Sequence, residues 1–137
     1  MTLANREEVD ITGARARRPA AILGGMDGEP LLPTALRTFI DATNAGDSDA
    51  FVAAFTEDAV LDDWGRVFRG HAGIADWNRT DNIGVGSQFE VVGLERTADP
   101  HRLVATLRVT GGGYNGTGPI TFEFRGDRIA RVEIAPA

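Results

Sequence analysis

The sequence predicts an α+β domain in which helices come first and strands follow. Within residues 33–81, apolar side chains recur with the period of an α-helix. From residue 89 onward they alternate with polar ones, as in strands with one buried face. With 137 residues, 42% of them hydrophobic, the chain is long and apolar enough for one domain with its own core. We therefore expect three helices packed in a curved mixed or antiparallel sheet.

Two short helices are expected at the start of the domain. Pro33 suits a first helical turn, because the N–H that it lacks would have no partner there. Side chains at helical spacing then define one buried face: Leu36, Phe39, Ile40 and Thr43. Gly46 suits the left-handed position after a helix, and Asp47 suits the N-cap of the next one. The second helix would bury Phe51 and Phe55.

An extended apolar run, residues 59–64, contains two adjacent acids, Asp62 and Asp63, and residues 66–69 pair back as a short strand. Side chains alternate along a strand, so the two acids must point to opposite faces. One of them can face an interior, and if it is Asp63 it shares that face with Leu61. Exposure of both acids is the alternative.

A third helix is expected over residues 71–81. One of its faces carries four residues at helical spacing: Ile74, Trp77, Asn78 and Asp81. An asparagine beside a tryptophan on a core-facing surface indicates a wet cavity, since a buried amide needs hydrogen-bond partners. Residues 82–86 read as a flexible link.

Four strands are expected in the second half of the chain. They cover residues 89–95, 103–110, 120–125 and 128–134. Gly126-Asp127 would join the last two as a tight hairpin, and Asn115-Gly116 is a type I′ turn signal for the preceding hairpin.

Composition and charge exclude several classes of function. The formal charge of −6 argues against nucleic acid or an anionic membrane as the main partner. All fourteen basic residues are arginine, which excludes Schiff-base chemistry on lysine. The absence of cysteine excludes disulfides and thiolate sites, and two histidines are too few for a histidine-rich metal cage. No cofactor and no metal are expected.

Residues 1–30 lack periodicity and are expected to be a weakly ordered extension or arm outside the domain of residues 31–137. Arg17-Arg18 precede an apolar run, but Asp27 and Glu29 interrupt it too early for a twin-arginine export signal. Membrane spans need about 18 apolar residues in a row, which the sequence lacks. A cytoplasmic protein is expected.

The order of these segments resembles the NTF2-like superfamily and, within it, the SnoaL-like and ketosteroid-isomerase-like branch of small bacterial proteins. The resemblance covers residues 33–135. It is carried by NAGDSDAFVAAFTEDAVLDD, FRGHAGIADW and ITFEFRGDRIARVEI. It implies a cone in which the sheet curls around the first helix and leaves a mostly apolar pocket, and it implies a homodimer. Because this fold hosts isomerases, cyclases, hydrolases and binders, it does not by itself identify a reaction.

Residue by residue, the resemblance places the general base of the isomerases on Asp63. The position of the oxyanion-stabilising tyrosine falls on Phe39, and that of a protonated aspartate falls on Ile120. Neither side chain donates a hydrogen bond, and losing one such donor costs about 3 kcal/mol of transition-state stabilisation. A classical steroid isomerase is therefore not expected.

The catalytic candidates follow from these observations. Asp63 would be the acid or base, and Arg66, Asn78 and Tyr114 would orient water or substrate oxygens. An apolar pocket would suit Asp63 to acid–base chemistry, whereas a salt bridge to Arg66 or Arg69 is the alternative. The expected pocket walls are Phe39, Leu61, Trp64, Phe68, Trp77 and Ile120, although both tryptophans could also be core.

Two functions stay open on the sequence. One is a cofactor-independent isomerase, cyclase or hydrolase that uses Asp63 on an apolar, oxygenated small molecule. The other is a non-catalytic ligand-binding or dimeric scaffold domain, which the missing oxyanion donors favour.

Overall fold

The computed structural model describes residues 32–135, so the predicted extension, residues 1–30, lies outside the described part. The helices of this part are α1 (Thr34–Ala45), α2 (Ser48–Ala53), α3 (Gly70–Asp81) and the 3-10 helix η1 (Ile83–Val85). Its strands are β1 (Phe55–Asp63), β2 (Arg66–Arg69), β3 (Gln88–Arg96), β4 (Arg102–Thr110), β5 (Gly116–Arg125) and β6 (Arg128–Ile134). None of these helices has the length and apolar character needed to cross a bilayer.

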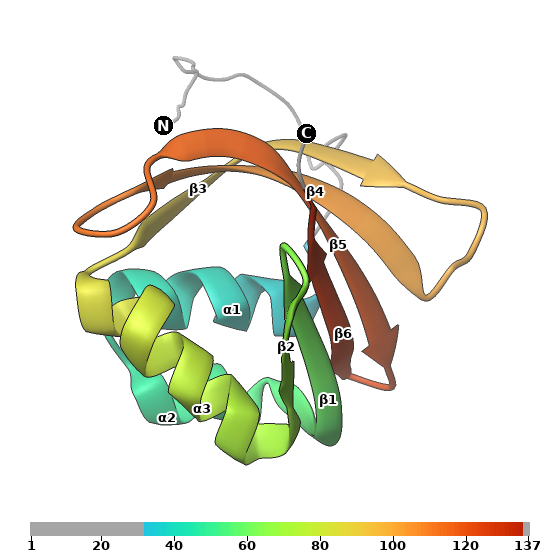
Figure 1. Ribbon diagram of the computed structural model, residues 1–137. Helices are drawn as coiled ribbons and strands as arrows, with labels where there is room; N and C mark the ends of the chain where they lie inside the picture. The colour runs from blue at the N-terminus through green and yellow to red at the C-terminus, as the bar shows by residue number, and fades with distance from the viewer. Residues whose placement is uncertain (1–31, 136–137) are drawn as a thin grey trace. The chain divides into compact units, whose positions relative to one another are not determined.

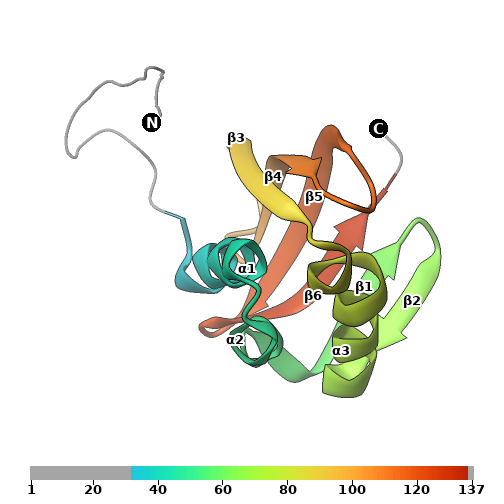
Figure 2. The ribbon, with the colours of Figure 1, turned by 90° about the vertical axis from the view of Figure 1, so that its left-hand side faces the viewer.

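The strands form one sheet in the order β2-β1-β6-β5-β4-β3. Strands β1 and β6 are parallel and the other neighbours are antiparallel, so the sheet is mixed. Figures 1 and 2 show the sheet curving around α1, α2 and α3, which lie on its concave side. Register shifts between Val91 and Gly93 and between Glu123 and Phe124 accompany this bend, as β-bulges do. The predicted α+β class and the curved mixed sheet are confirmed.

The core is centred on Phe39 of α1, which is fully buried. Its ring lies 5.1 to 6.1 Å from four other phenylalanine rings: Phe51, Phe55, Phe89 and Phe122. Leu61 of β1 is also fully buried. Phe39 and Leu61, which the sequence suggested as pocket walls, are therefore core residues, and neither lines the cavity described below.

Local capping follows the sequence closely. Gly46 has φ 73°, the left-handed conformation that ends α1. The Asp47 carboxylate accepts a hydrogen bond from the backbone N–H of Ala50 at 3.1 Å and caps α2. One boundary differs, since α2 ends at Ala53 and Phe55 opens β1, where it pairs with Ile129 of β6.

The link after α3 was expected to be flexible, and the structure contradicts this. Residues 83–85 form η1, and a Cβ at Gly84 would lie 1.6 Å from the carbonyl oxygen of Arg79. Glycine is therefore needed there for close backbone packing, and not for mobility.

The predicted two-residue turn at Asn115-Gly116 is also wrong. Residues 111–115 form a longer connection, in which the Asn115 side chain binds the backbone of Gly111 and Gly113. Strand β5 begins at Gly116, earlier than expected, and includes Pro119. Proline is tolerated because pairing with β6 begins only at Ile120, so this stretch of β5 has β4 on one side and an open edge on the other.

We predict that Phe39→Ala lowers the free energy of unfolding by about 3–5 kcal/mol, because it opens a cavity inside the aromatic cluster. Urea denaturation followed by circular dichroism measures the loss. Val92→Ala, at an exposed position of β3, is the control and should cost well under about 1 kcal/mol. Equal losses in the two variants would contradict the placement of Phe39 at the centre of the core.

Candidate functional site

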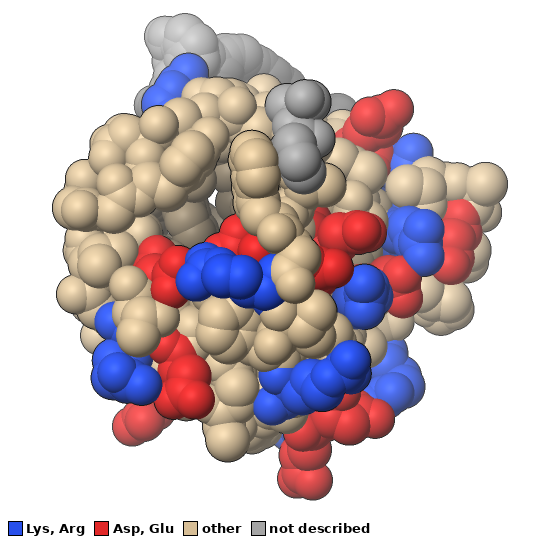
Figure 3. Space-filling view, viewed as in Figure 1, with Lys and Arg blue, Asp and Glu red and all other residues tan. Residues whose placement is uncertain are grey.

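A cavity of about 500 Å³ lies between the end of α3 and the sheet. Its walls combine apolar side chains from the strands with polar ones from the β1–β2 hairpin and the α3–β3 connection. Its lining includes Asp63, Trp77, Asp81, Asn82, Ser87 and Tyr114. Figure 3 shows a hollow with charged side chains along one side. The charged residues that line the cavity are Asp63, Arg66 and Asp81.

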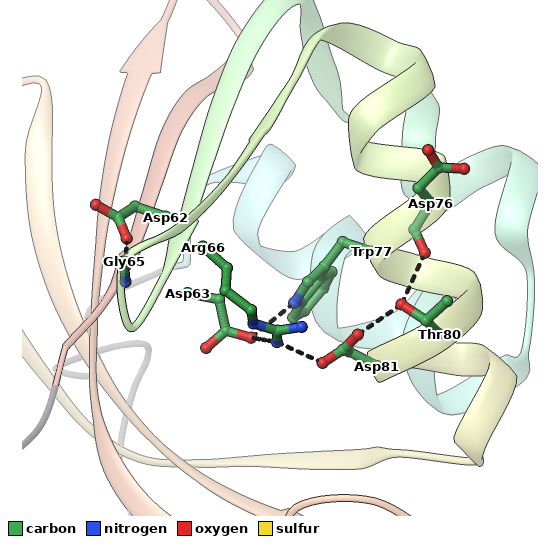
Figure 4. A network of polar contacts seen from close by, with 8 residues as sticks. All are labelled: Asp62, Asp63, Gly65, Arg66, Asp76, Trp77, Thr80 and Asp81. Atoms are coloured by element: carbon green, nitrogen blue, oxygen red, sulfur yellow. Dashed lines mark hydrogen bonds and ion pairs between the residues drawn. The ribbon is translucent and has the colours of Figure 1, made fainter.

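Asp63 is held in the cavity wall through one of its two oxygens. Its Oδ2 accepts a hydrogen bond from Arg66 Nη2 at 2.7 Å and another from Trp77 Nε1 at 3.0 Å (Figure 4). Its side chain is only 16% exposed. Within residues 32–135, Oδ1 has no hydrogen-bond partner. The carboxylate is thus positioned at one oxygen and available at the other.

Arg66 joins this carboxylate to a second one that the sequence did not single out. The same Nη2 donates to Asp81 Oδ2 at 2.6 Å, so one nitrogen of the guanidinium bridges two acids (Figure 4). The guanidinium carbon of Arg66 also lies 5.5 Å from the ring centre of Phe68, its neighbour on the same face of β2. Phe68, an expected wall residue, is not among the residues that line the cavity and instead supports Arg66 from the side.

The second acid, Asp81, is oriented from both of its oxygens. Thr80 Oγ1 donates to Asp81 Oδ1 at 2.5 Å. The Arg66 guanidinium holds the pKa of Asp81 below its usual value, with the Thr80 hydroxyl acting in the same direction and burial opposing it. The pKa of Arg66 is raised in turn, chiefly by Asp81. Asp81 therefore anchors the arginine that positions Asp63.

Asp62 points away from this network, as strand alternation predicts. Its Oδ1 accepts from the backbone N–H of Gly65 at 2.8 Å in the β1–β2 turn, on the other side of the hairpin (Figure 4). The adjacent acids therefore have separate surroundings, and the inward one is Asp63, which shares its face with buried Leu61.

Two of the predicted aromatic residues stand at exposed positions of the cavity wall. Trp64 and Tyr114 both line the cavity and are 61% and 62% exposed. Trp64 has φ 55°, and Gly65 after it has φ 90°, the two positive values that a two-residue type I′ turn requires. A left-handed conformation is strained for a bulky side chain, and such strain is concentrated at functional sites. Trp77 and Ile120 also line the cavity, as expected.

Asn78 occupies a different place from the one the sequence suggested. It is buried but is not among the cavity-lining residues. Its amide nitrogen donates to Ser48 Oγ at 3.1 Å, and its oxygen accepts from Asn82 Nδ2 at 3.1 Å. The side chain thus ties α3 to α2, because its position in the helix turns it toward the helix layer, and this does not fit a direct contact with ligand.

Five polar lining residues were missed as site candidates: Thr80, Asp81, Asn82, Ser87 and Thr117. Asp81 could have been found, since it lies one turn after Trp77 on the helix face that the periodicity had identified. Asn82 and Ser87 flank η1, which the sequence presented as a glycine-rich link without any structural signal.

The β4–β5 connection closes the cavity next to η1. The backbone N–H of Gly112 donates to the carbonyl oxygen of Val85 at 2.9 Å. A Cβ at Gly112 would lie 2.7 Å from that same oxygen, and one at Gly113 would lie 2.8 Å from Val85 Cγ2. The glycines permit this close approach and thereby hold Tyr114 at the cavity.

Among residues 32–135, no group of three or more histidine, aspartate or glutamate side chains is arranged to hold a metal ion. His71, the histidine nearest to this region in sequence, has Nε2 2.9 Å from the carbonyl oxygen of Phe55. It therefore links the start of α3 to β1 and does not line the cavity.

We predict that Asp81→Asn lowers the free energy of unfolding at pH 7 by up to about 1 kcal/mol, the range for a partly exposed ion pair. A carboxylate whose folded-state pKa is depressed stabilises the fold above its unfolded pKa of about 4 and stops doing so as the pH falls through the folded value. The difference between wild type and variant should therefore shrink below about pH 4, as measured by urea denaturation. Asp76→Asn, on the exposed face of the same helix, is the control. A pH-independent difference would exclude the Arg66–Asp81 pair as its cause.

Several solved protein structures are similar to this chain. A candidate polyketide cyclase from Sinorhizobium meliloti is 27% identical, with a TM-score of 0.63 over 74% of this chain and 94% of that one. The ketosteroid isomerase from Mycobacterium sp. is 18% identical, with a TM-score of 0.65 over 75% of this chain and 92% of that one. A Mycobacterium tuberculosis protein in complex with estradiol-17beta-hemisuccinate is 14% identical, with a TM-score of 0.66 over 75% and 92%.

The last two likenesses show the fold alone. No curated protein sequence matches this chain significantly. The model of the SnoaL-like domain matches residues 36–132, which is well over half of the chain. The chain therefore belongs to the SnoaL-like family of NTF2-like proteins.

Proposed function

We propose that this protein binds an apolar, oxygenated small molecule in the cavity and that Asp63 acts on it as an acid or base. The reaction class would be a cofactor-independent isomerisation, cyclisation or hydrolysis. The observation that carries the proposal is the carboxylate itself. Asp63 lies in a largely apolar wall, is fixed at Oδ2 by Arg66 and Trp77, and has Oδ1 without a partner in the described residues.

The fixed geometry is what general acid–base catalysis requires, because the catalytic group must lie within hydrogen-bond reach of the proton that it moves. With Oδ2 held, Oδ1 can accept a proton from a bound water or from a carbon beside a carbonyl. Arg66 cannot give up its own proton near neutral pH, so it acts as a fixed charge beside Asp63. Asp81 keeps that charge in place, which gives an acid–arginine–acid arrangement at the cavity wall.

The ligand class follows from the lining and from related proteins. A volume of about 500 Å³ accommodates a molecule of several fused rings. Two of the similar proteins are described as a candidate polyketide cyclase and a ketosteroid isomerase. The third, from Mycobacterium tuberculosis, is in complex with a steroid derivative. These substrates and ligands share flat apolar rings with oxygen substituents. Exposed Trp64 and Tyr114 suit the faces of such rings.

A non-catalytic binding protein is the second candidate, and one observation favours it. The two positions where the resemblance places oxyanion donors carry Phe39, buried in the core, and Ile120, an apolar wall residue. An enolate formed in this cavity would therefore lack the two donors of the steroid isomerases. Hydrolysis in which Asp63 activates a water molecule forms no enolate and does not depend on those two positions.

The homodimer and the cytoplasmic location expected from the sequence remain predictions. Light scattering coupled to size-exclusion chromatography measures the first, and fractionation of the source cells measures the second.

We predict that Asp63→Asn lowers turnover by at least about 100-fold while preserving the fold and ligand binding, because it removes the proton acceptor and keeps the shape. Turnover would be followed by mass spectrometry on a panel of ring epoxides, unsaturated ketosteroids and polyketide-derived aldehydes. Binding would be followed by intrinsic fluorescence, since both tryptophans of the chain line the cavity.

The matched control is Asp62→Asn, which changes the adjacent acid on the opposite face of β1 and should leave turnover near the wild-type value. Turnover unchanged in Asp63→Asn, or lost equally in both variants, would contradict the catalytic proposal. Binding without turnover in the wild-type protein across the panel would favour the second candidate.

A further inference from the structure

The connection between α3 and β3 holds a network of side-chain amides whose directions follow from one backbone donor. The backbone N–H of Ile83 can only donate, so the Asn78 side-chain atom 3.4 Å from it is the oxygen Oδ1. Asn82 also places a side-chain atom 3.1 Å from Asn78 Oδ1, and that atom must be the nitrogen Nδ2. The same Nδ2 donates to Thr43 Oγ1 at 3.0 Å, whose own proton goes to the carbonyl oxygen of Phe39.

This network leaves one strong acceptor unused. With Nδ2 committed to Asn78 and Thr43, the oxygen Oδ1 of Asn82 has no hydrogen bond within the described residues. Asn82 is only 1% exposed to solvent and lines the cavity. A buried carbonyl oxygen without a donor is costly, and native structures rarely retain one without a reason.

Ser87 adds a second unused group to the same cavity wall. Its backbone N–H donates to the carbonyl oxygen of Asn82 at 3.1 Å, which closes the loop around η1 and holds the two residues together. Ser87 is 2% exposed and lines the same cavity. Its hydroxyl makes no hydrogen bond to any residue between 32 and 135, although a hydroxyl can both donate and accept.

We propose that Asn82 Oδ1 and Ser87 Oγ form a subsite that recognises a hydroxyl group on the ligand. The inference rests on the proposed ligand-binding function of the cavity and narrows the ligand to an alcohol or phenol. Asn82 Oδ1 can only accept, so it requires a donor, which a ketone or ether oxygen cannot supply. A hydroxyl satisfies both protein groups, because it donates to Asn82 and accepts from Ser87.

The position of the subsite gives the ligand an orientation. Asn82 follows Asp81 directly in the chain, and Asp81 belongs to the network that holds Asp63. The cavity therefore has a charged polar region, with Asp63, Arg66 and Asp81, and a neutral buried one. A ligand whose hydroxyl is held by the neutral region presents the rest of its ring system to the wall that contains Asp63.

The test is a comparison of alcohols with their matching ketones in the full-length protein. Three pairs with two or four rings serve as probes: borneol and camphor, decalol and decalone, and testosterone and androstenedione. Dissociation constants come from quenching of tryptophan fluorescence. In the wild-type protein the best-fitting alcohol should bind about threefold to tenfold more tightly than its ketone, the value of one hydrogen bond.

The variant Ser87→Ala distinguishes the contribution of Ser87 Oγ to ligand binding from that of Asn82 Oδ1. It should weaken the binding of the alcohol and of the ketone by a similar factor, about threefold to tenfold, because both ligands accept a hydrogen bond from the Ser87 hydroxyl. The preference for the alcohol should persist. Thermal unfolding of the variant should match that of the wild type, since the hydroxyl has no partner in the described residues. The control Thr121→Val removes a hydroxyl from β5 at a residue that does not line the cavity, and it should change neither dissociation constant.

Equal binding of alcohol and ketone in the wild type would overturn the role of Asn82, and unchanged binding in Ser87→Ala would overturn that of Ser87. Failure of all six probes to bind would overturn the ligand cavity and, with it, the subsite. Loss of turnover in Asp63→Asn with no preference for alcohols would retain the proposed function and reject the subsite alone.

Discussion

Burial of α1 against the concave face of the sheet is the constraint on which the rest of the structure depends. The ring of Phe39 meets phenylalanine rings from α2, β1, β3 and β5, so one side chain joins the helix layer to most of the sheet. Burial of large apolar side chains is the dominant favourable term in folding. The cluster occupies only part of the concave face. Phe89 and Trp77 touch it on one side and line the cavity on the other, so the cavity wall is the outer surface of the core.

This arrangement explains how a carboxylate comes to lie in an apolar wall. Strand β1 begins beside the aromatic cluster at Phe55, runs past the core through Leu61 and ends at the cavity. Its last inward position carries Asp63. The tight turn that follows returns Arg66 directly opposite Asp63 in the antiparallel register, so their contact is local and depends little on the rest of the fold. Because α3 packs along β1, Trp77 can donate to Asp63 and Asp81 can accept from Arg66.

Neighbouring residues at the end of α3 have two roles, one structural and one at the cavity. Asn78 faces the helix layer and fixes the connection to β3, whereas Asp81 and Asn82 face the cavity. The directional bonds that hold the connection also leave Asn82 Oδ1 without a donor. A structural network can thus create a binding group, since an amide whose nitrogen is fully used has only its oxygen left for a ligand.

Much of this could be predicted from the sequence, because it depends on short-range rules. Helix periodicity identified the buried face of α1, capping residues identified the break at Gly46 and Asp47, and strand alternation separated Asp62 from Asp63. The resemblance to SnoaL-like proteins supplied the curved sheet and the pocket. These features are determined within a few residues of the chain or by the order of elements.

Other features were decided only by tertiary packing. Phe39 became core and Asn78 a structural tie, because a helix face shows which side is buried but not whether it meets packed side chains or a cavity. Gly84 looked flexible, yet a carbonyl oxygen close to it leaves no room for a side chain. The second acid, Asp81, and the unused oxygen of Asn82 acquire their roles from partners 15 and 39 residues away. Short-range patterns in the sequence are enough to predict the fold and to place Asp62 and Asp63 on opposite faces. Which acid faces inward, and which polar groups share the cavity with it, depends on how separate elements pack.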